Sequence, residues 1–262
     1  MKYQNELKVA KVAALQAGQY LAKEFETFHR QAASHKSHHE LVTKCDKQAE
    51  KIIFQTLKKH FPKINFLSEE KGANHLASDY LWVIDPLDGT NNFTIHHPLF
   101  AVAIALVYKQ ETVMSVIYIP MLKEMFWATN EGAYLNGKKI TVSKNYNFHD
   151  LFVTYCHGKT LKDNHKAFKA YEYFHLNAHD CRHFGSTSIE LAMVACGRTD
   201  ALMVSNPSFW DVAPGIWLVQ KAGGLVTDWR GKSWNTKSSS VLASNKKINT
   251  LIIKQFKKLK VA

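Results

Sequence analysis

The chain has 262 residues, of which 46% are hydrophobic, and a formal net charge of +12 at pH 7. This composition predicts a globular protein with a substantial core, and it excludes collagen-like, coiled-coil and disordered chains. No apolar run approaches the roughly 20 residues that cross a bilayer. Residues 1–6 lack the apolar segment of a signal peptide. We therefore expect a cytoplasmic protein that makes no membrane contact.

Cysteine and histidine spacing gives no indication of a disulfide framework or a zinc site. The densest group of histidines lies in residues 35–39, with no cysteine at ligand spacing. In a reducing compartment the cysteines are expected to be free and mostly buried. The chain contains four of them, widely separated: Cys45, Cys156, Cys181 and Cys196.

The first half of the chain changes from helical to strand periodicity. Apolar residues at helical spacing predict helices over residues 4–28 and 44–60, separated by a polar, histidine-rich loop at about 31–40. The second helix ends before Pro62. Apolar runs and a hairpin signal at Asn136-Gly137 then predict strands over residues 64–67, 81–84, 100–108, 113–119, 125–129 and 138–142.

From about residue 145, strands alternate with helices, a pattern that is typical of layered α/β packing. Strands are predicted over residues 151–155, 180–183, 201–204, 225–227 and 241–243. Helices are predicted over residues 163–175, 187–196, 211–222 and 246–259. No long linker intervenes, so we expect an α+β half over residues 1–144 and an α/β half over residues 145–262 that share a tight interface.

The strongest indication of function lies in residues 82–93, where an apolar strand delivers Asp85 at its carboxyl end. Pro86 fixes a turn, and the spacing of Asp88 lets that turn direct both carboxylates to one place. Two such carboxylates repel each other, and the segment contains no Arg or Lys. A hard divalent cation is expected there, and magnesium fits best. The alternative is an ordinary β-turn rich in turn-forming residues.

The residues that follow Asp88 favour an anionic ligand. Gly89 permits close approach of the backbone to a ligand. Thr90 and Asn91 are expected to begin a short helical turn whose N–H groups face an anion.

Other acidic residues support the metal hypothesis. Glu69 and Glu70 end the preceding strand and would lie beside Asp85 if the two strands are neighbours; otherwise they form an exposed acidic loop. Asp211 opens a helix after Trp210, where the common alternative is an N-cap.

In these motifs the chain resembles the inositol monophosphatase family of lithium-sensitive, magnesium-dependent phosphatases. The resemblance implies a layered αβαβα sugar-phosphatase fold and hydrolysis of a small phosphomonoester, such as inositol monophosphate or a related sugar or polyol phosphate. It also implies a homodimer. The matching segments cover nearly the whole chain: Leu41-Val42-Thr43 with Asp46, Ser68-Glu69-Glu70, Asp85 to Phe93, Gly185-Ser186, and Trp210-Asp211 to Gly223-Gly224.

The same resemblance assigns roles to individual residues. Two Mg²⁺ ions, with a weaker third near Glu69, would be held by Glu69, Asp85, the Leu87 carbonyl, Asp88 and Asp211. Asp46 and Thr90 would orient and deprotonate the attacking water, with Glu69 assisting. The substrate would contact Asp88, the backbone of Gly89 and Thr90, Asn91, Gly185, Ser186, Thr187 and Asp211. Without the resemblance, Asp46 is a helix-end acid and Thr187-x-x-Glu190 fits a capping box.

Two positions depart from the animal members of that family. Asn91 stands where they have threonine, and Val204 stands where they have a substrate-binding glutamate. Inositol specificity is therefore not expected. The alternatives are a nucleotide 3′-phosphatase, a fructose-bisphosphatase-like enzyme, a histidinol-phosphate or NADP phosphatase, and a basic protein that contacts RNA or transcription machinery. The Lys-rich end, residues 246–260, predicts only weak, electrostatic nucleic-acid binding.

Overall fold

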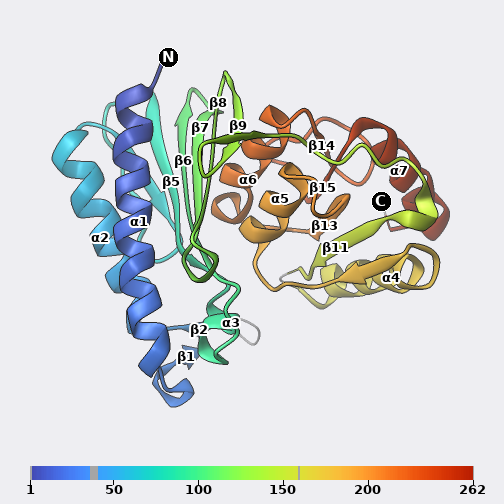
Figure 1. Ribbon diagram of the computed structural model, residues 1–262, viewed down its shortest axis with the longest axis horizontal. Helices are drawn as coiled ribbons and strands as arrows, with labels where there is room; N and C mark the ends of the chain where they lie inside the picture. Colours follow the sequence, from blue (N-terminus) through green and yellow to red (C-terminus); the bar gives the residue numbers. More distant parts are fainter. Residues whose placement is uncertain (1, 36–40, 159, 262) are drawn as a thin grey trace.

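The structure, a computed structural model, describes residues 2–35, 41–158 and 160–261. Its longer helices are α1 (Gln4–Thr27), α2 (Lys44–His60), α4 (Leu161–Asn177), α5 (Thr187–Ala195), α6 (Phe209–Lys221) and α7 (Lys246–Leu259). A short helix, α3 (Thr90–Thr94), lies apart from them, beneath the two sheets in Figure 1.

An eight-stranded sheet, mostly antiparallel, forms the first half of the protein. Its strands, from edge to edge, are β10 (Lys138–Ile140), β9 (Gly132–Leu135), β8 (Glu124–Thr129), β7 (Glu111–Ile119), β6 (Ala101–Tyr108), β5 (Tyr80–Asp88), β3 (Asn65–Ser68) and β4 (Gly72–Ala73). The pair β3 and β5 is parallel.

A five-stranded sheet forms the second half. Its strands, from edge to edge, are β12 (Asp180–Arg182), β11 (Phe152–Cys156), β13 (Ala201–Ser205), β15 (Ser240–Ser244) and β14 (Leu225–Thr227). The strands β12, β11 and β13 run parallel.

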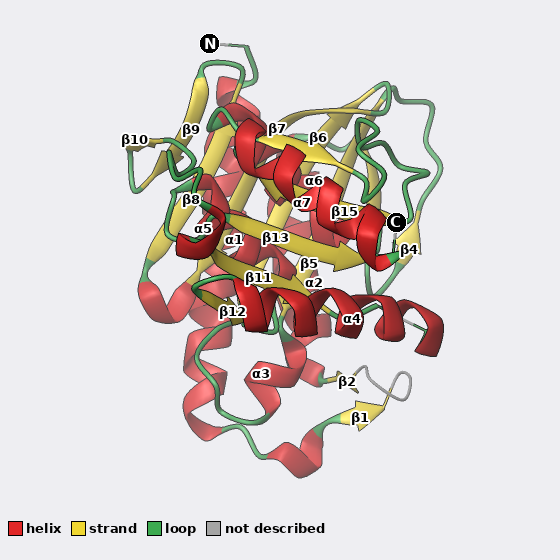
Figure 2. Cartoon of the chain, turned by 90° about the vertical axis from the view of Figure 1, so that its right-hand side faces the viewer, coloured by secondary structure: helices red, strands yellow, loops and turns green. Residues whose placement is uncertain are grey.

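The two sheets and the helices form five layers (Figure 1). Helices α1 and α2 cover one face of the eight-stranded sheet, and α5 and α6 lie between the sheets. Helices α4 and α7 cover the outer face of the five-stranded sheet, as Figure 2 shows from that side. The predicted layered αβαβα fold is confirmed.

Small residues allow the helices to approach their neighbours closely. A Cβ atom on Gly18 of α1 would lie 2.4 Å from the Tyr118 ring of β7. A Cβ on Gly215 of α6 would lie 2.4 Å from Leu191 of α5. Interiors are close-packed, so side chains at these two positions would force the layers apart. The central pair α5 and α6 is thereby held tightly between the sheets.

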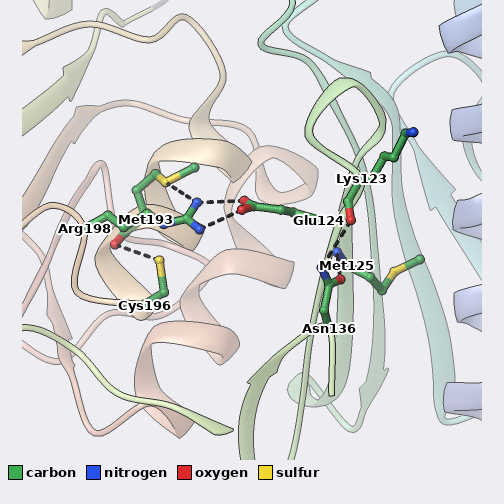
Figure 3. A network of polar contacts seen from close by, with 7 residues as sticks. All are labelled: Lys123, Glu124, Met125, Asn136, Met193, Cys196 and Arg198. Carbon is green, nitrogen blue, oxygen red and sulfur yellow. Dashed lines mark hydrogen bonds and ion pairs between the residues drawn. The ribbon is translucent and has the colours of Figure 1, made fainter. Parts of the chain in front are cut away.

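A bidentate ion pair ties the central layer to the first sheet (Figure 3). Arg198, which follows α5, donates to both carboxylate oxygens of Glu124 on β8 at 2.7 and 2.6 Å. Asn136 fixes the same end of β8, because its Oδ1 accepts from the Met125 N–H at 2.8 Å.

The chain crosses from the first sheet to the second in residues 141–147. The division into halves at residues 144 and 145 stays a prediction.

Most predicted elements are present, with several differences. Strands β4 and β9 are not among the elements predicted from the sequence. Residues 36–40 of the predicted histidine-rich loop lie outside the described residues, whereas Ser34–His35 pairs with Leu41–Val42 as β1 and β2. The last hairpin strand ends at Ile140. Strand β5 continues to Asp88, beyond the predicted turn. The four cysteines are free, as expected, and three of them are buried. Across the described ranges, no helix combines the length and apolar character of a membrane span.

Candidate active site

A β-bulge in β5 places Asp85 and Asp88 on the same face of the sheet. Asp85 pairs with Ala103 of β6 and Asp88 pairs with Ala101, so three steps on β5 match two on β6. Side chains three positions apart in a regular strand would point to opposite faces. The extra residue on β5 returns the Asp88 side chain to the face that Asp85 occupies. Their partners on β6, Ala103 and Ala101, are two positions apart and therefore face the same side. The carboxylates converge through a bulge within the strand and not through a turn after it.

The parallel pairing of β3 with β5 brings Glu69 to this edge. Ser68 pairs with Ile84, so Glu69 emerges beside Asp85 as the neighbouring-strand hypothesis predicted. Asp85 is buried, and burial is the main cause that raises its pKa well above the ordinary range. The nearby carboxylates of Glu69, Asp88 and Asp211 raise the Asp85 pKa further. The structure thus gathers four acidic side chains from separate parts of the chain.

Asp46 serves both the helix and the site. At the third position of α2, its Oδ2 accepts from the Thr43 N–H at 2.8 Å and from the Thr43 hydroxyl at 2.6 Å, which forms a capping box. Its Oδ1 lies 2.9 Å from the Thr90 hydroxyl. That hydroxyl is also 3.0 Å from the Leu87 carbonyl oxygen. Burial raises the Asp46 pKa, and the hydrogen bonds from Thr43 and Thr90 oppose the shift.

The start of α6 presents Asp211 to the same cavity. Helix α6 begins at Phe209, and its N-cap is Ser208, whose N–H donates to Asp211 Oδ2 at 2.9 Å. Asp211 is therefore the third residue of the helix, and the N-cap interpretation is wrong. A carboxylate in the first turn also complements the helix dipole.

The start of α5 closes the cavity from the second half. Ser186 is the buried N-cap of α5, and its hydroxyl accepts from the Ile189 N–H at 3.4 Å. The predicted Thr187–Glu190 capping box is wrong, because Glu190 accepts from the Phe184 N–H instead, at 2.7 Å. The first turn of α5 contacts an acidic residue of β5 directly, since the Ser188 N–H donates to Asp88 Oδ2.

Asn92 joins the two halves beside the site, a role that sequence reasoning missed. Its Nδ2 donates to the Leu99 carbonyl and to the Phe184 carbonyl, both at 2.6 Å. Gly185 has a φ of +74°, and a Cβ there would lie 2.9 Å from the Asn92 amide. This position therefore requires glycine for both its backbone conformation and its space. No sequence signal distinguishes Asn92 from the residues beside it, because its partners lie far apart in the chain.

A cavity of about 600 Å³ contains most of the predicted site residues. Asp46 and Ser186 do not line it: Asp46 lies behind Thr90, and Ser186 is enclosed in the α5 cap. The predicted residues on its wall are Glu69, Asp85, Leu87, Asp88, Gly89, Thr90, Asn91, Gly185, Thr187 and Asp211.

The donor set fits a hard divalent cation. The cavity wall contains four carboxylates and no Lys or Arg among the described residues. Oxygen donors of this kind suit Mg²⁺. No three of the acidic ligand atoms lie within 4.8 Å of one another in the described chain. Oxygen ligands of one Mg²⁺ lie within about 4.2 Å of one another, so these side chains would have to rotate toward each other when an ion binds.

Part of the cavity wall carries other chemistry that the sequence did not indicate. Cys156, His157, His183 and Val204 line it, together with Asn206. Val204 pairs with Cys156 across β13 and β11, at the carboxyl ends of parallel strands. Ligands commonly bind at such strand ends.

Three known proteins compare closely with the whole chain. A fructose-1,6-bisphosphatase/inositol-1-monophosphatase from Aquifex aeolicus (strain VF5) is 32% identical over 254 residues, which are 96% of this chain and 95% of that protein. The Nus factor SuhB of Escherichia coli (strain K12) is 37% identical over 254 residues, 92% of each chain. The solved structure of extragenic suppressor protein suhB from Bartonella henselae has a TM-score of 0.92 at 33% identity, covering 97% of this chain and 99% of that chain.

An acidic cavity lined by residues from both halves of a layered αβαβα fold is the architecture of a phosphatase-type protein. The chain belongs to the inositol monophosphatase family, whose sequence model matches residues 2–260. The resemblance seen in the sequence motifs is thereby confirmed.

Proposed function

We propose that the protein hydrolyses a small phosphomonoester with magnesium as its cofactor. The observation that carries the proposal is the convergence of Glu69, Asp85, Asp88 and Asp211 on one cavity whose described wall has no Lys or Arg. A phosphate ester and four carboxylates repel one another, so a divalent cation must lie between them for the substrate to bind. Family membership supports the same chemistry.

The predicted metal ligands divide between two ions. Glu69, Asp85 and the Leu87 carbonyl would hold the first, and Asp85, Asp88 and Asp211 the second, with Glu69 contributing to a weaker third. When bound, such ions polarise a phosphoryl oxygen and make a bound water acidic enough to attack. The bulge that aligns Asp85 with Asp88 is the local feature that supports this shared arrangement.

Thr90 and Asp46 are proposed to orient the attacking water and receive its proton. A hydroxyl has one hydrogen, so Thr90 can donate to Asp46 or to the Leu87 carbonyl but not to both at once. When it donates to Asp46, its lone pairs can accept from a water in the cavity. The proton then passes from water to the Thr90 oxygen as the threonine proton moves to Asp46.

The substrate-binding wall of the cavity is proposed to select substrates by their shape more than by the pattern of their hydroxyl groups. The backbone of Gly89 and Thr90 would bind phosphate oxygens, and Gly185 with Thr187 would flank the leaving group. Asp88, Asn91 and Asp211 complete the substrate-binding set, with Ser186 acting through the α5 cap. The far wall presents apolar Val204 where the animal enzymes have an acid. We therefore propose a broad preference for sugar and polyol phosphates, including inositol monophosphate.

Phosphate release tests this proposal directly. Purified protein is assayed against inositol 1-phosphate, fructose 1,6-bisphosphate, histidinol phosphate, NADP and a nucleotide 3′-phosphate, with magnesium or with chelator. Magnesium should be required, and added calcium should inhibit, because calcium prefers more ligands at longer distances. Equal rates in chelator and magnesium would refute the proposal. A single strongly preferred substrate would refute the broad preference only.

A second candidate function is contact with transcription machinery. Two observations favour it: the net charge of +12, and the similarity to a protein named a Nus factor. We propose that any nucleic-acid binding is weak and electrostatic, because α7 is rich in lysine and has one aromatic residue, Phe256, which is buried. RNA binding measured between 50 and 200 mM salt should then fall steeply, by roughly 10³-fold or more if several phosphates are contacted. Salt-resistant binding would favour a specific partner role. From family membership we also propose a cytoplasmic homodimer, and light scattering tests the dimeric state.

A further inference from the structure

Three side chains with metal-binding chemistry meet at the wall of the active-site cavity, which two of them, Cys156 and His183, line. Cys156 ends β11, His183 follows β12, and Glu190 lies in α5. One ligand atom from each lies within 4.8 Å of the others, and among the described residues no other trio of His, Cys, Asp or Glu is so close. We call these three residues the Cys-His-Glu cluster.

The donor atoms of the Cys-His-Glu cluster match a borderline-soft metal and not magnesium. Thiolate, imidazole and carboxylate together are ligands of Zn²⁺, at about 2.3, 2.0 and 2.1 Å from the ion. Tetrahedral coordination at these lengths needs donor atoms about 3.3–3.6 Å apart. Cys156 Sγ is already 3.3 Å from Glu190 Oε2. Small side-chain rotations would complete the geometry.

Neighbouring groups hold the three ligands in place. Glu190 is fully buried, and its Oε1 accepts from the Phe184 N–H at 2.7 Å, which leaves Oε2 directed at Cys156. The Thr187 hydroxyl lies 3.4 Å from Cys156 Sγ. The His183 ring packs against Tyr155 at a centroid distance of 5.1 Å. Such outer contacts orient metal ligands and raise affinity.

We propose that Cys156, His183 and Glu190 form a second metal site, selective for Zn²⁺ or a similar transition metal. Binding would displace the thiol proton of Cys156 and any carboxyl proton of Glu190 into solvent. Three protein ligands leave the fourth position open to the cavity, which Cys156 and His183 both line. An ion there would occupy the leaving-group side of the cavity. The consequence for catalysis, inhibition by zinc, rests on the proposed phosphatase function; the metal site itself does not.

Cobalt is the probe for the site, because a thiolate ligand gives Co²⁺ a charge-transfer absorption that oxygen ligands do not give. Co²⁺ is titrated into the wild type and into Asp85→Asn, which weakens the carboxylate site while leaving the cluster unchanged. One thiolate-bound cobalt per chain is expected in both proteins. Adding one equivalent of Zn²⁺ should remove the band.

Substitutions in the Cys-His-Glu cluster distinguish its metal ligands from nearby residues that do not bind the metal. Cys156→Ser should abolish the charge-transfer band, and His183→Ala and Glu190→Gln should each weaken cobalt affinity at least tenfold. Cys181→Ser is the matched control, because Cys181 is a buried thiol on the adjacent strand that lies outside the cluster. Circular dichroism establishes that each variant is folded. A band that persists in Cys156→Ser, or no band in the folded wild type, would overturn the proposal.

Inhibition is measured separately in magnesium buffer, relative to the activity of each variant without zinc. Micromolar Zn²⁺ should inhibit the wild type and Cys181→Ser, and the zinc concentration for half-inhibition should rise at least tenfold in Cys156→Ser. Equal sensitivity in all three proteins would refute the inhibitory role. If the wild type releases no phosphate, the proposed function fails, whereas the cobalt titration still decides whether the metal site exists.

Discussion

The hydroxyl of Thr90 and the carboxylate of Asp46, 44 positions apart in the chain, lie within hydrogen-bonding distance at 2.9 Å. Because the other oxygen of Asp46 is fixed by the Thr43 capping box, the carboxylate is anchored to α2 while it faces the site. Two otherwise ordinary residues, a helix-end acid and the first residue of a short helix, thereby become hydrogen-bonded neighbours, and the proposed proton transfer depends on this contact.

Thr90→Ala should lower kcat by about 10²–10⁴-fold, the usual worth of a positioned proton-transfer group. KM and magnesium affinity should change little, because the threonine side chain is not a predicted metal ligand. Thr90→Ser keeps the hydroxyl and should recover most of the activity. Steady-state kinetics at saturating magnesium make the measurement, and an unchanged kcat in Thr90→Ala would exclude this residue from the proton path.

Asp85→Asn should reduce turnover by about a thousandfold or more, since one carboxylate is assigned to both ions. Burial and three nearby carboxylates raise the Asp85 pKa, so its charged form is a cost to the folded state. Because the Asp85 pKa is raised, the free-energy cost of its charged form in the folded state grows as pH rises above the ordinary pKa of an aspartate. In chelator at pH 8, Asp85→Asn should therefore melt at a higher temperature than the wild type.

Magnesium should reverse this order of melting temperatures, so that the wild type melts at a higher temperature than Asp85→Asn. A ligand at 100 times its Kd stabilises a folded protein by about 2.7 kcal/mol, and this gain should be largely lost in Asp85→Asn. Glu111→Gln, an exposed substitution, is the control and should follow the wild type. If magnesium raises the melting temperature of Asp85→Asn as much as that of the wild type, Asp85 is not a ligand.

Glu190→Gln should flatten the dependence of stability on pH. Burial raises the pKa of Glu190 to about 8, from an ordinary value of 4.5. The folded state therefore holds a proton that the unfolded state releases, and stability falls as pH rises from about 4.5 to about 8. Glutamine cannot titrate. In urea unfolding with chelator, the variant should match the wild type near pH 5 and exceed it by a few kcal/mol at pH 8.

Glu131→Gln provides the comparison, because Glu131 is exposed. Its free energy of unfolding should follow the wild-type pH profile. Parallel profiles for Glu190→Gln and the wild type would show that Glu190 is not the source of the slope.

Asn92→Ala should destabilise the fold by about 1–3 kcal/mol, because two partly buried carbonyl groups, those of Leu99 and Phe184, would lose their shared donor. The free energy of unfolding from urea titration measures the effect. Gln48→Ala, on the exposed side of α2, should change stability by less than about 0.5 kcal/mol. A loss no larger than in that control would mean that Asn92 does not join the halves.

Val204→Glu should raise kcat/KM for inositol 1-phosphate relative to an aryl phosphate by about tenfold, because a carboxylate can accept hydrogen bonds from inositol hydroxyls. Val204 is 1% exposed, so thermal melting must accompany the kinetics. Val204→Gln has the same size without the charge and should shift the ratio less. An unchanged ratio in a folded Val204→Glu variant would place the leaving-group contact elsewhere, with Asn206 as the next candidate on that wall.

The amino-acid sequence by itself determined the helices, most strands and the acidic motif around Asp85. These features depend on local physics: apolar periodicity, turn-forming residues, and the mutual repulsion of carboxylates at short spacing. The neighbouring position of Glu69 also followed, because it required only that two adjacent strands pair.

Only the tertiary structure decided which distant residues meet. The bulge that aligns Asp85 with Asp88 depends on pairing with β6, and the bridge made by Asn92 depends on how the two halves pack. The Cys-His-Glu cluster has no signature in sequence spacing, because its members come from three elements that converge only when β11, β12 and α5 pack together. Periodicity encodes which face of an element is buried, whereas contacts across the sheets are set by register and packing, which no single segment of the sequence contains.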